Sequence, residues 1–453
     1  MTILALSRRQ ALVAMAGFAA MGLPWRGADA APRIERVVSP GGIAAWLVSD
    51  RRIPVISMQM AFRGGAALDP AEKLGRANLA TQLLDEGAGP YDSQGFQRRV
   101  EGIAASLGFD DGRDTTSGWV KTLSRHRVEA FELLALAMTA PRFDAEPLER
   151  ARSAVLGRLK RNSEDPDYLA GRLWWRRMAG DHPYARPSNG VPRTVEKLSA
   201  EDARAFVGER LARDNLVVGC VGDISASELA GVLDAVFGAL PARAAPWRLP
   251  AAPSRAPGGT VVFERPVAQS VASFGHAGIR RGNPDYYAAY VMNHVLGGGS
   301  FSSRLYQEVR ERRGLAYSIY TFLNPLDAGG FVQGGVATQN ARMAETVAIV
   351  RDQWRRMADE GASAAELADA KSFLTGSFPL QFDSTDRIAR LLVSIQLDDL
   401  GLDYLDRRNA FIEAVSASDL ARVARRLLDP AQLTFAVVGQ PAGLEAERVD
   451  AVE

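Results

Sequence analysis

The chain has 453 residues, 47% of them hydrophobic and 24% charged, which is typical of a globular protein long enough for two or more domains. Its formal net charge is +1. The basic run from Arg310 to Arg313 is short and mixed in sign, so we exclude nucleic acid as a partner. The single cysteine, Cys220, lies in an apolar run; an internal disulfide is therefore impossible and a buried thiol is expected.

The first 30 residues have the pattern of an export signal. Ser7-Arg8-Arg9 precedes an apolar stretch from Ala11 to Leu23, and Ala28-Asp29-Ala30 supplies small residues at cleavage spacing. The apolar stretch is too short for a transmembrane span. We interpret residues 1–30 as a twin-arginine signal peptide, with a Sec signal as the alternative. The mature chain is then expected to begin at Ala31, to lack a membrane span and to be periplasmic.

Strands are predicted to open each half of the mature chain, and helices to follow. The first half, residues 31–240, has β-like runs over 43–48 and 55–62 and helical patterns over 75–84, 146–160 and 169–178. The second half, residues 260–453, has β-like runs over 260–263 and 271–276. This order favours α+β halves, each a sheet packed with helices.

An internal repeat relates the two halves. The segment from Ser199 to Val221-Gly222 recurs from Ser416 to Val438-Gly439 with one constant offset. In both copies a serine begins a capped amphipathic helix, and an apolar strand ending in Val-Gly follows. Residues 241–259, between the halves, are rich in proline, which restricts the backbone and removes amide donors. We interpret this stretch as a linker.

Two further segments carry a resemblance to a known family. The first reads Gly75-Arg-Ala-Asn78-Leu-Ala-Thr81-Gln82-Leu-Leu-Asp-Glu-Gly-Ala. The second reads Leu296-Gly297-Gly298-Gly299-Ser-Phe-Ser-Ser-Arg-Leu-Tyr-Gln-Glu-Val-Arg310-Glu-Arg-Arg-Gly314-Leu-Ala-Tyr317. Together with the repeat, they resemble the insulinase/pitrilysin family, which includes mitochondrial processing peptidase. The resemblance covers essentially the whole mature chain and implies two homologous halves, each a mostly antiparallel sheet packed with helices.

The resemblance also implies that the zinc site is lost. Active members of the family carry His-x-x-Glu-His on the first helix, where the histidines bind zinc and the glutamate is the base. Asn78, Thr81 and Gln82 stand at those positions. The third ligand is expected near Leu156-Gly157-Arg158, where no carboxylate is present. The resemblance therefore implies that this chain binds no metal and is inactive alone.

Other metal or catalytic sites have little support in the sequence. The four histidines, His126, His182, His276 and His294, contain no pair at helical ligand spacing, so we expect surface or core roles for them. The cluster from Asp110 to Asp114 resembles a calcium loop only loosely, and we expect a solvated turn there.

The second-half signature is retained. A glycine-rich turn, Gly297-Gly298-Gly299, is expected to enter a helix that closes at Gly314 with a left-handed cap, and an apolar strand is expected to follow. The resemblance implies that Arg310 and Tyr317 reach toward the zinc-bearing half of a complex and bind the scissile region of a peptide. The alternative is a solvated arginine and a packed aromatic ring.

Three hypotheses follow for function. The first is a non-catalytic subunit of a heterodimeric zinc metallopeptidase, with zinc held by a homologous partner and with peptides or unfolded segments as substrates. The second is a non-enzymatic scaffold or peptide-binding protein of the same fold. The third is an autonomous metallopeptidase with unrecognised ligands.

Overall fold

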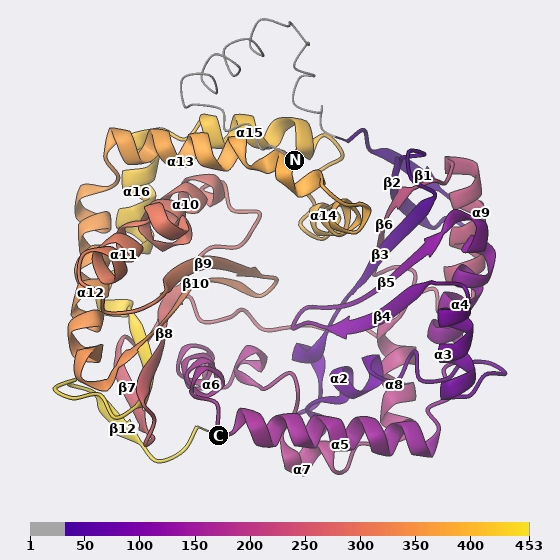
Figure 1. Cartoon of the computed structure of the whole chain (residues 1–453), viewed down its shortest axis with the longest axis horizontal. Coiled ribbons are helices and arrows are strands. Elements are labelled where there is room, and N and C mark those ends of the chain that lie inside the picture. Colours follow the sequence, from indigo (N-terminus) through magenta and orange to yellow (C-terminus); the bar gives the residue numbers. More distant parts are fainter. Residues whose placement is uncertain (1–31, 453) are drawn as a thin grey trace, which may run out of the picture.

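The computed structural model describes residues 32–452, so the predicted export signal lies outside the described residues. Two six-stranded sheets form its framework (Figure 1). The first has the strand order β1 (Glu35–Val38), β2 (Ala44–Ser49), β6 (Leu216–Gly222), β3 (Val55–Arg63), β5 (Thr115–Leu123) and β4 (Ser106–Asp111). The second has the order β12 (Glu447–Val449), β7 (Gly259–Glu264), β11 (Thr434–Gly439), β8 (Gln269–Ala277), β10 (Gly329–Gln339) and β9 (Ile319–Leu326).

The two sheets share one topology, as the sequence repeat predicts. Strand β6 is parallel to β2 and antiparallel to β3, and β11 is likewise parallel to β7 and antiparallel to β8. The helix before each of these strands begins with a capping box, Ser199 with Asp202 in one half and Ser416 with Asp419 in the other. The predicted α+β class with two similar, mostly antiparallel halves is confirmed.

Helices pack around the two sheets (Figure 1). Those of the first half are α2 (Arg76–Thr81), α3 (Ser93–Gly102), α4 (Arg127–Thr139), α5 (Ala145–Asn162), α7 (Pro192–Val195), α8 (Ala200–Arg210) and α9 (Ala226–Phe237). Those of the second half are α10 (Tyr286–Asn293), α11 (Arg304–Tyr306), α12 (Met343–Glu360), α13 (Ala364–Gly376), α15 (Tyr404–Glu413) and α16 (Ala417–Leu427). Cys220, on β6, is buried and free, as predicted, and burial raises the pKa of its thiol to about 12.

Each half also contributes one helix to the other half. Helix α6 (Pro166–Ala179) packs on β8 and β11 of the second sheet, where the Trp175 and Phe331 ring centroids are 5.0 Å apart. Helix α14 (Thr385–Leu397) packs on β3 and β6 of the first sheet, beside Gly219, whose lack of a side chain allows the close approach (Figure 1). The sequence pattern specifies that α6 has an apolar face but not which sheet receives it.

The stretch between the sheets contains no helix or strand over residues 241–258. It is nevertheless attached to both halves, because the Ala245 amide donates to the Glu209 carbonyl and the Ala252 amide donates to the Ala328 carbonyl. A search of the described residues finds no helix with the length and apolar character that a membrane span requires.

Candidate functional site

The short helix α2 carries the positions that correspond to the family's zinc motif. It begins after Gly75, whose φ of +91° is left-handed and whose added Cβ would lie 2.9 Å from the Asn189 carbonyl oxygen. The Asp69 carboxylate caps the helix by accepting hydrogen bonds from the amides of Gly75 and Ala77. The helix ends at Thr81, earlier than the predicted residue 84, and the chain continues as turns.

Asn78 lies at the centre of a hydrogen-bond network. Its side-chain oxygen accepts from Arg158 Nη2 at 2.7 Å and from Gln82 Nε2 at 2.8 Å. Its side-chain nitrogen donates to Asp111 Oδ1 at 2.7 Å. We name Asn78, Gln82, Asp111 and Arg158 the polar network. Helix α5 therefore brings Arg158, which lies where the family's third zinc ligand is expected, into contact with Asn78.

The charges in this region are partly buried. Burial raises the pKa of the Asp111 carboxyl, although the hydrogen bond from Asn78 and the charge of Arg158 oppose that rise. Burial also raises the pKa of Asp69 to about 7, while the backbone hydrogen bonds and Arg76 act against it. The Asn78 amide therefore joins a guanidinium and a carboxylate in a medium where losing either hydrogen bond is unfavourable.

These donors do not fit a zinc ion. Zinc in proteins is held by cysteine, histidine and carboxylate groups, whereas here a guanidinium and amide groups occupy the position. The Thr81 hydroxyl donates to the carbonyl oxygens of Ala77 and Asn78 in its own helix. Among residues 32–452, no three histidine, cysteine or acidic side chains gather in a way that could hold a metal ion. That the chain binds no metal remains a prediction for elemental analysis.

The segment from Asp110 to Asp114 differs from the solvated turn expected from the sequence. Asp111 belongs to the polar network, and the Asp114 carboxylate accepts hydrogen bonds from the Tyr184 hydroxyl at 2.7 Å and from the Asp327 amide at 2.9 Å. Because these partners are distant in sequence, the local pattern could not reveal them. The turn instead joins the first sheet to the β9–β10 turn of the second.

Three of the four histidines lie in the core of the protein. His182, His276 and His294 are buried. The His276 ring nitrogen Nε2 accepts a hydrogen bond from Trp354 Nε1 at 2.8 Å, and the His182 ring nitrogen Nδ1 accepts one from the Tyr184 amide. These contacts agree with the expected core roles.

The glycine-rich segment packs closely against strand β9. An added Cβ on Gly297 would lie 2.5 Å from Thr321, and one on Gly299 would lie 2.7 Å from the His294 carbonyl oxygen. The helix expected after these glycines is present as one run from Arg304 to Glu311, in which α11 (Arg304–Tyr306) continues as a π-helical turn (Gln307–Glu311). Gly314 has the expected left-handed conformation, with a φ of +59°. The glycine-rich turn, the helix and the left-handed residue that follows it are therefore as predicted.

Arg310 and Tyr317 lie next to each other. The Arg310 guanidinium carbon is 4.8 Å from the Tyr317 ring centroid and 4.9 Å from that of Tyr306. Tyr317 is 82% exposed, so it is not the packed aromatic of the alternative interpretation. The nearest carboxylate partner of Arg310 in the described part of the chain is Glu311, at 3.8 Å. Both side chains therefore have donors free to reach a ligand.

Sequence reasoning missed other exposed aromatic residues beside this pair. Phe301, Tyr320 and Phe322 are 68%, 52% and 41% exposed, and the last two alternate with buried residues on β9. Strand β9 is at the edge of its sheet, so the expected apolar strand is only half buried. We name Phe301, Tyr317, Tyr320 and Phe322 the aromatic surface. The alternation in Ile-Tyr-Thr-Phe is the signal that could have revealed it.

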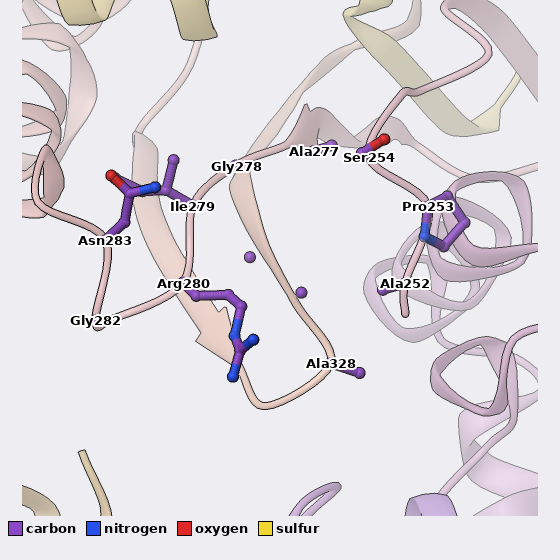
Figure 2. Close-up of a pocket in the computed structure, with 12 residues that line it drawn as sticks. Ala252, Pro253, Ser254, Ala277, Gly278, Ile279, Arg280, Gly282, Asn283 and Ala328 are labelled. Atoms are coloured by element: carbon purple, nitrogen blue, oxygen red, sulfur yellow. The ribbon is translucent and has the colours of Figure 1, made fainter. Parts of the chain in front are cut away.

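The cavity in Figure 2 lies elsewhere, between the linker and the second half. It has a volume of about 590 Å³ and is lined mostly by backbone and small side chains, and Arg280 extends along it (Figure 2). Its lining contains no acid or histidine that could act as a base. Arg310 and Tyr317 are not part of it.

The fold and the polar network together define a class of protein: a peptidase-type fold of two similar halves in which amide and guanidinium groups fill the metal position. Residues 197–374 match the family model described as the peptidase M16 inactive domain. A crystal structure of a peptidase M16 inactive domain from Pseudomonas fluorescens matches with a TM-score of 0.85 at 27% identity and covers 91% of this chain and 98% of that one.

Two curated relatives extend the match over most of the chain. The non-peptidase homolog YmxG of Helicobacter pylori is 28% identical over 389 residues, which are 85% of this chain and 89% of that protein. The probable mitochondrial-processing peptidase subunit beta of Schizosaccharomyces pombe is 24% identical over 440 residues, or 92% and 93% of the two chains. The chain is therefore similar to the insulinase-type M16 peptidase family over most of its length, and Asn78, Thr81 and Gln82 stand at the positions of that family's zinc motif.

Proposed function

We propose that this chain is the non-catalytic subunit of a heterodimeric zinc metallopeptidase that acts on peptides or unfolded protein segments. The observation that carries the proposal is the exposed Arg310–Tyr317 pair in a chain whose zinc position is filled by Asn78 and Arg158. A homologous partner holds the zinc ion, and this chain contributes substrate-binding donors. The export signal predicted over residues 1–30 supports a periplasmic location for the complex.

The chemistry of the pair suits this role. A guanidinium and a phenol both donate hydrogen bonds, and neither is consumed when an oxyanion forms on the scissile carbonyl. The ring of Tyr306 and that of Tyr317 restrict the Arg310 guanidinium without using its N–H groups. Donors held in place before the substrate arrives lose little freedom on binding it, which favours the charged transition state.

The test is cleavage of an unfolded peptide by the assembled complex. Tyr317→Phe removes only the hydroxyl, and the loss of one such donor is expected to lower turnover about a hundredfold or more while assembly persists. Arg310→Ala should behave alike. The matched controls are Tyr320→Phe, another exposed phenol, and Arg312→Ala, whose exposed side chain pairs with Glu308. Both controls are expected to stay close to wild-type turnover.

A complex that assembles normally and retains full turnover with both Arg310→Ala and Tyr317→Phe would reduce this chain to a scaffold. That result would favour the non-enzymatic role expected as the alternative from the sequence.

A further inference from the structure

A cavity of about 240 Å³ lies where the turn between β4 and β5 meets helix α6. Arg113 comes from the turn, and Arg172 and Trp175 come from the helix. Ser188 and Asn189, from the loop before α7, line another side. The lining therefore combines two cations with a hydroxyl, an amide and an aromatic ring. None of these residues belongs to the polar network or to the aromatic surface.

The protein satisfies the two guanidinium groups only with neutral partners. Arg113 lies over the Trp175 ring, with 4.0 Å between the guanidinium carbon and the ring centroid, and its Nε points to a carbonyl oxygen at 3.4 Å. Arg172 donates from Nη1 to the Ala185 carbonyl oxygen at 2.7 Å. Over residues 32–452, neither arginine has a carboxylate within ion-pair distance.

This lack of counter-charge sets the cavity apart from another one lined by arginine. In the cavity between α11 and α12, Arg304 pairs with Glu366 at 2.6 Å and Arg312 pairs with Glu308. The guanidinium groups there are already neutralised by the protein. Within the described residues, Arg113 and Arg172 make no such direct ion pair, although Asp114 and Asp167 are nearby.

The electrostatic effects are consistent with an uncompensated positive site. Burial and the charge of Arg172 together lower the pKa of Arg113 to about 10, while the charge of Asp114 opposes that shift. Burial also lowers the pKa of Arg172. Of the two nearby acids, Asp114 is engaged by the Tyr184 hydroxyl, and Asp167 lies exposed at the rim. An anion between the two guanidinium groups would relieve their repulsion.

We propose that this cavity binds a compact oxyanion, a carboxylate or a phosphate group, held between Arg113 and Arg172. Guanidinium groups bind such anions through paired, charge-assisted hydrogen bonds, and Ser188 and Asn189 add neutral donors. The site is adjacent to the start of helix α2, because an added Cβ on Gly75 would lie 2.9 Å from the Asn189 carbonyl oxygen. The inference goes beyond the proposed function and does not depend on a partner subunit.

Calorimetric titration of the purified mature chain tests the proposal, with inorganic phosphate and acetate as separate probes. A third arm compares one short peptide with a free C-terminal carboxylate and the same peptide amidated. Saturable binding is expected for at least one oxyanion probe. Arg113→Ala and Arg172→Gln should each weaken it about tenfold or more, since each removes charged hydrogen bonds. Arg193→Ala, an exposed arginine on α7, is the control for net charge and should leave binding unchanged.

The arms separate the sources of the anion. Binding of phosphate without acetate identifies a phosphate site, and binding of the free but not the amidated peptide identifies a peptide C-terminus. Arg172→Gln keeps a polar side chain at this position, so it serves as the test if Arg113→Ala fails to fold. The proposal is overturned if no probe binds, or if binding is the same in the parent chain, Arg172→Gln and Arg193→Ala.

Discussion

Replacing Asn78 with leucine tests whether the polar network stabilises the fold at the position that corresponds to the family's zinc motif. Asn78 is only 7% exposed, and leucine keeps a similar volume while removing the amide. The change leaves Arg158 and Asp111 each without one hydrogen bond of 2.7 Å. A hydrogen bond to a charged group contributes about 1.5–3 kcal/mol, and both charged groups are half-buried, so we expect about 3 kcal/mol lower free energy of unfolding.

Urea-induced unfolding followed by circular dichroism measures this loss. Gln82→Leu is the matched control, because it removes only neutral hydrogen bonds to Asn78 and should lower the free energy of unfolding by about 1 kcal/mol. A double-mutant cycle that pairs Asn78→Leu with Arg158→Met should give a coupling energy of about 1–3 kcal/mol. The reasoning is refuted if Asn78→Leu is no more destabilising than Gln82→Leu.

Further predictions concern metal, pH and the exchanged helix. Restoring the family's zinc motif should not restore zinc binding or cleavage, because the Arg158 guanidinium still fills the position; one zinc per chain by elemental analysis would contradict this. The three changes are Asn78→His, Thr81→Glu and Gln82→His. The hydrogen bonds from Arg304 lower the pKa of Glu366 from 4.5 to about 2. Because the pKa of Glu366 is lowered in the folded state, this carboxylate stabilises the fold above pH 4.5, and the stabilisation is lost as pH falls toward 2. The free energy of unfolding of a Glu366→Gln variant, measured between pH 4.5 and 2, should therefore depend less on pH than that of the parent chain. Leu392→Ala, in the buried face of α14, should lower the free energy of unfolding by about 3 kcal/mol in urea, and a change as small as that of exposed Arg390→Ala would argue against the exchanged packing.

The sequence predicts the halves well because their signals are local. The serine caps, the helical periodicity and the apolar strands each depend on residues close in the chain, so the repeat predicts equivalent strands β6 and β11. The sheet on which α6 or α14 packs depends on contacts between the halves, and no local sequence pattern specifies those contacts. The helix pattern of residues 169–178 is correct, but its buried face lies on the other sheet.

The sequence likewise predicts only part of the candidate site. The motif positions Asn78, Thr81 and Gln82 follow from the sequence, but the contact between Arg158 and Asn78 needs α5 to pack beside α2. The prediction of a solvated turn at Asp114 is wrong because its partners, Tyr184 and the Asp327 amide, are distant in sequence. The two arginines of the anion cavity come from separate elements, so spacing along the chain does not connect them.

Cleavage of an unfolded peptide by the purified mature chain, assayed alone and mixed with a homologue that carries the intact zinc motif, tests the central claim most directly. We expect no chelator-sensitive cleavage by this chain alone and cleavage by the mixture that exceeds that of the homologue by itself. Chelator-sensitive cleavage by this chain alone would contradict the account, because the chain would then need a metal of its own although the polar network around Asn78 fills the position of the family's zinc.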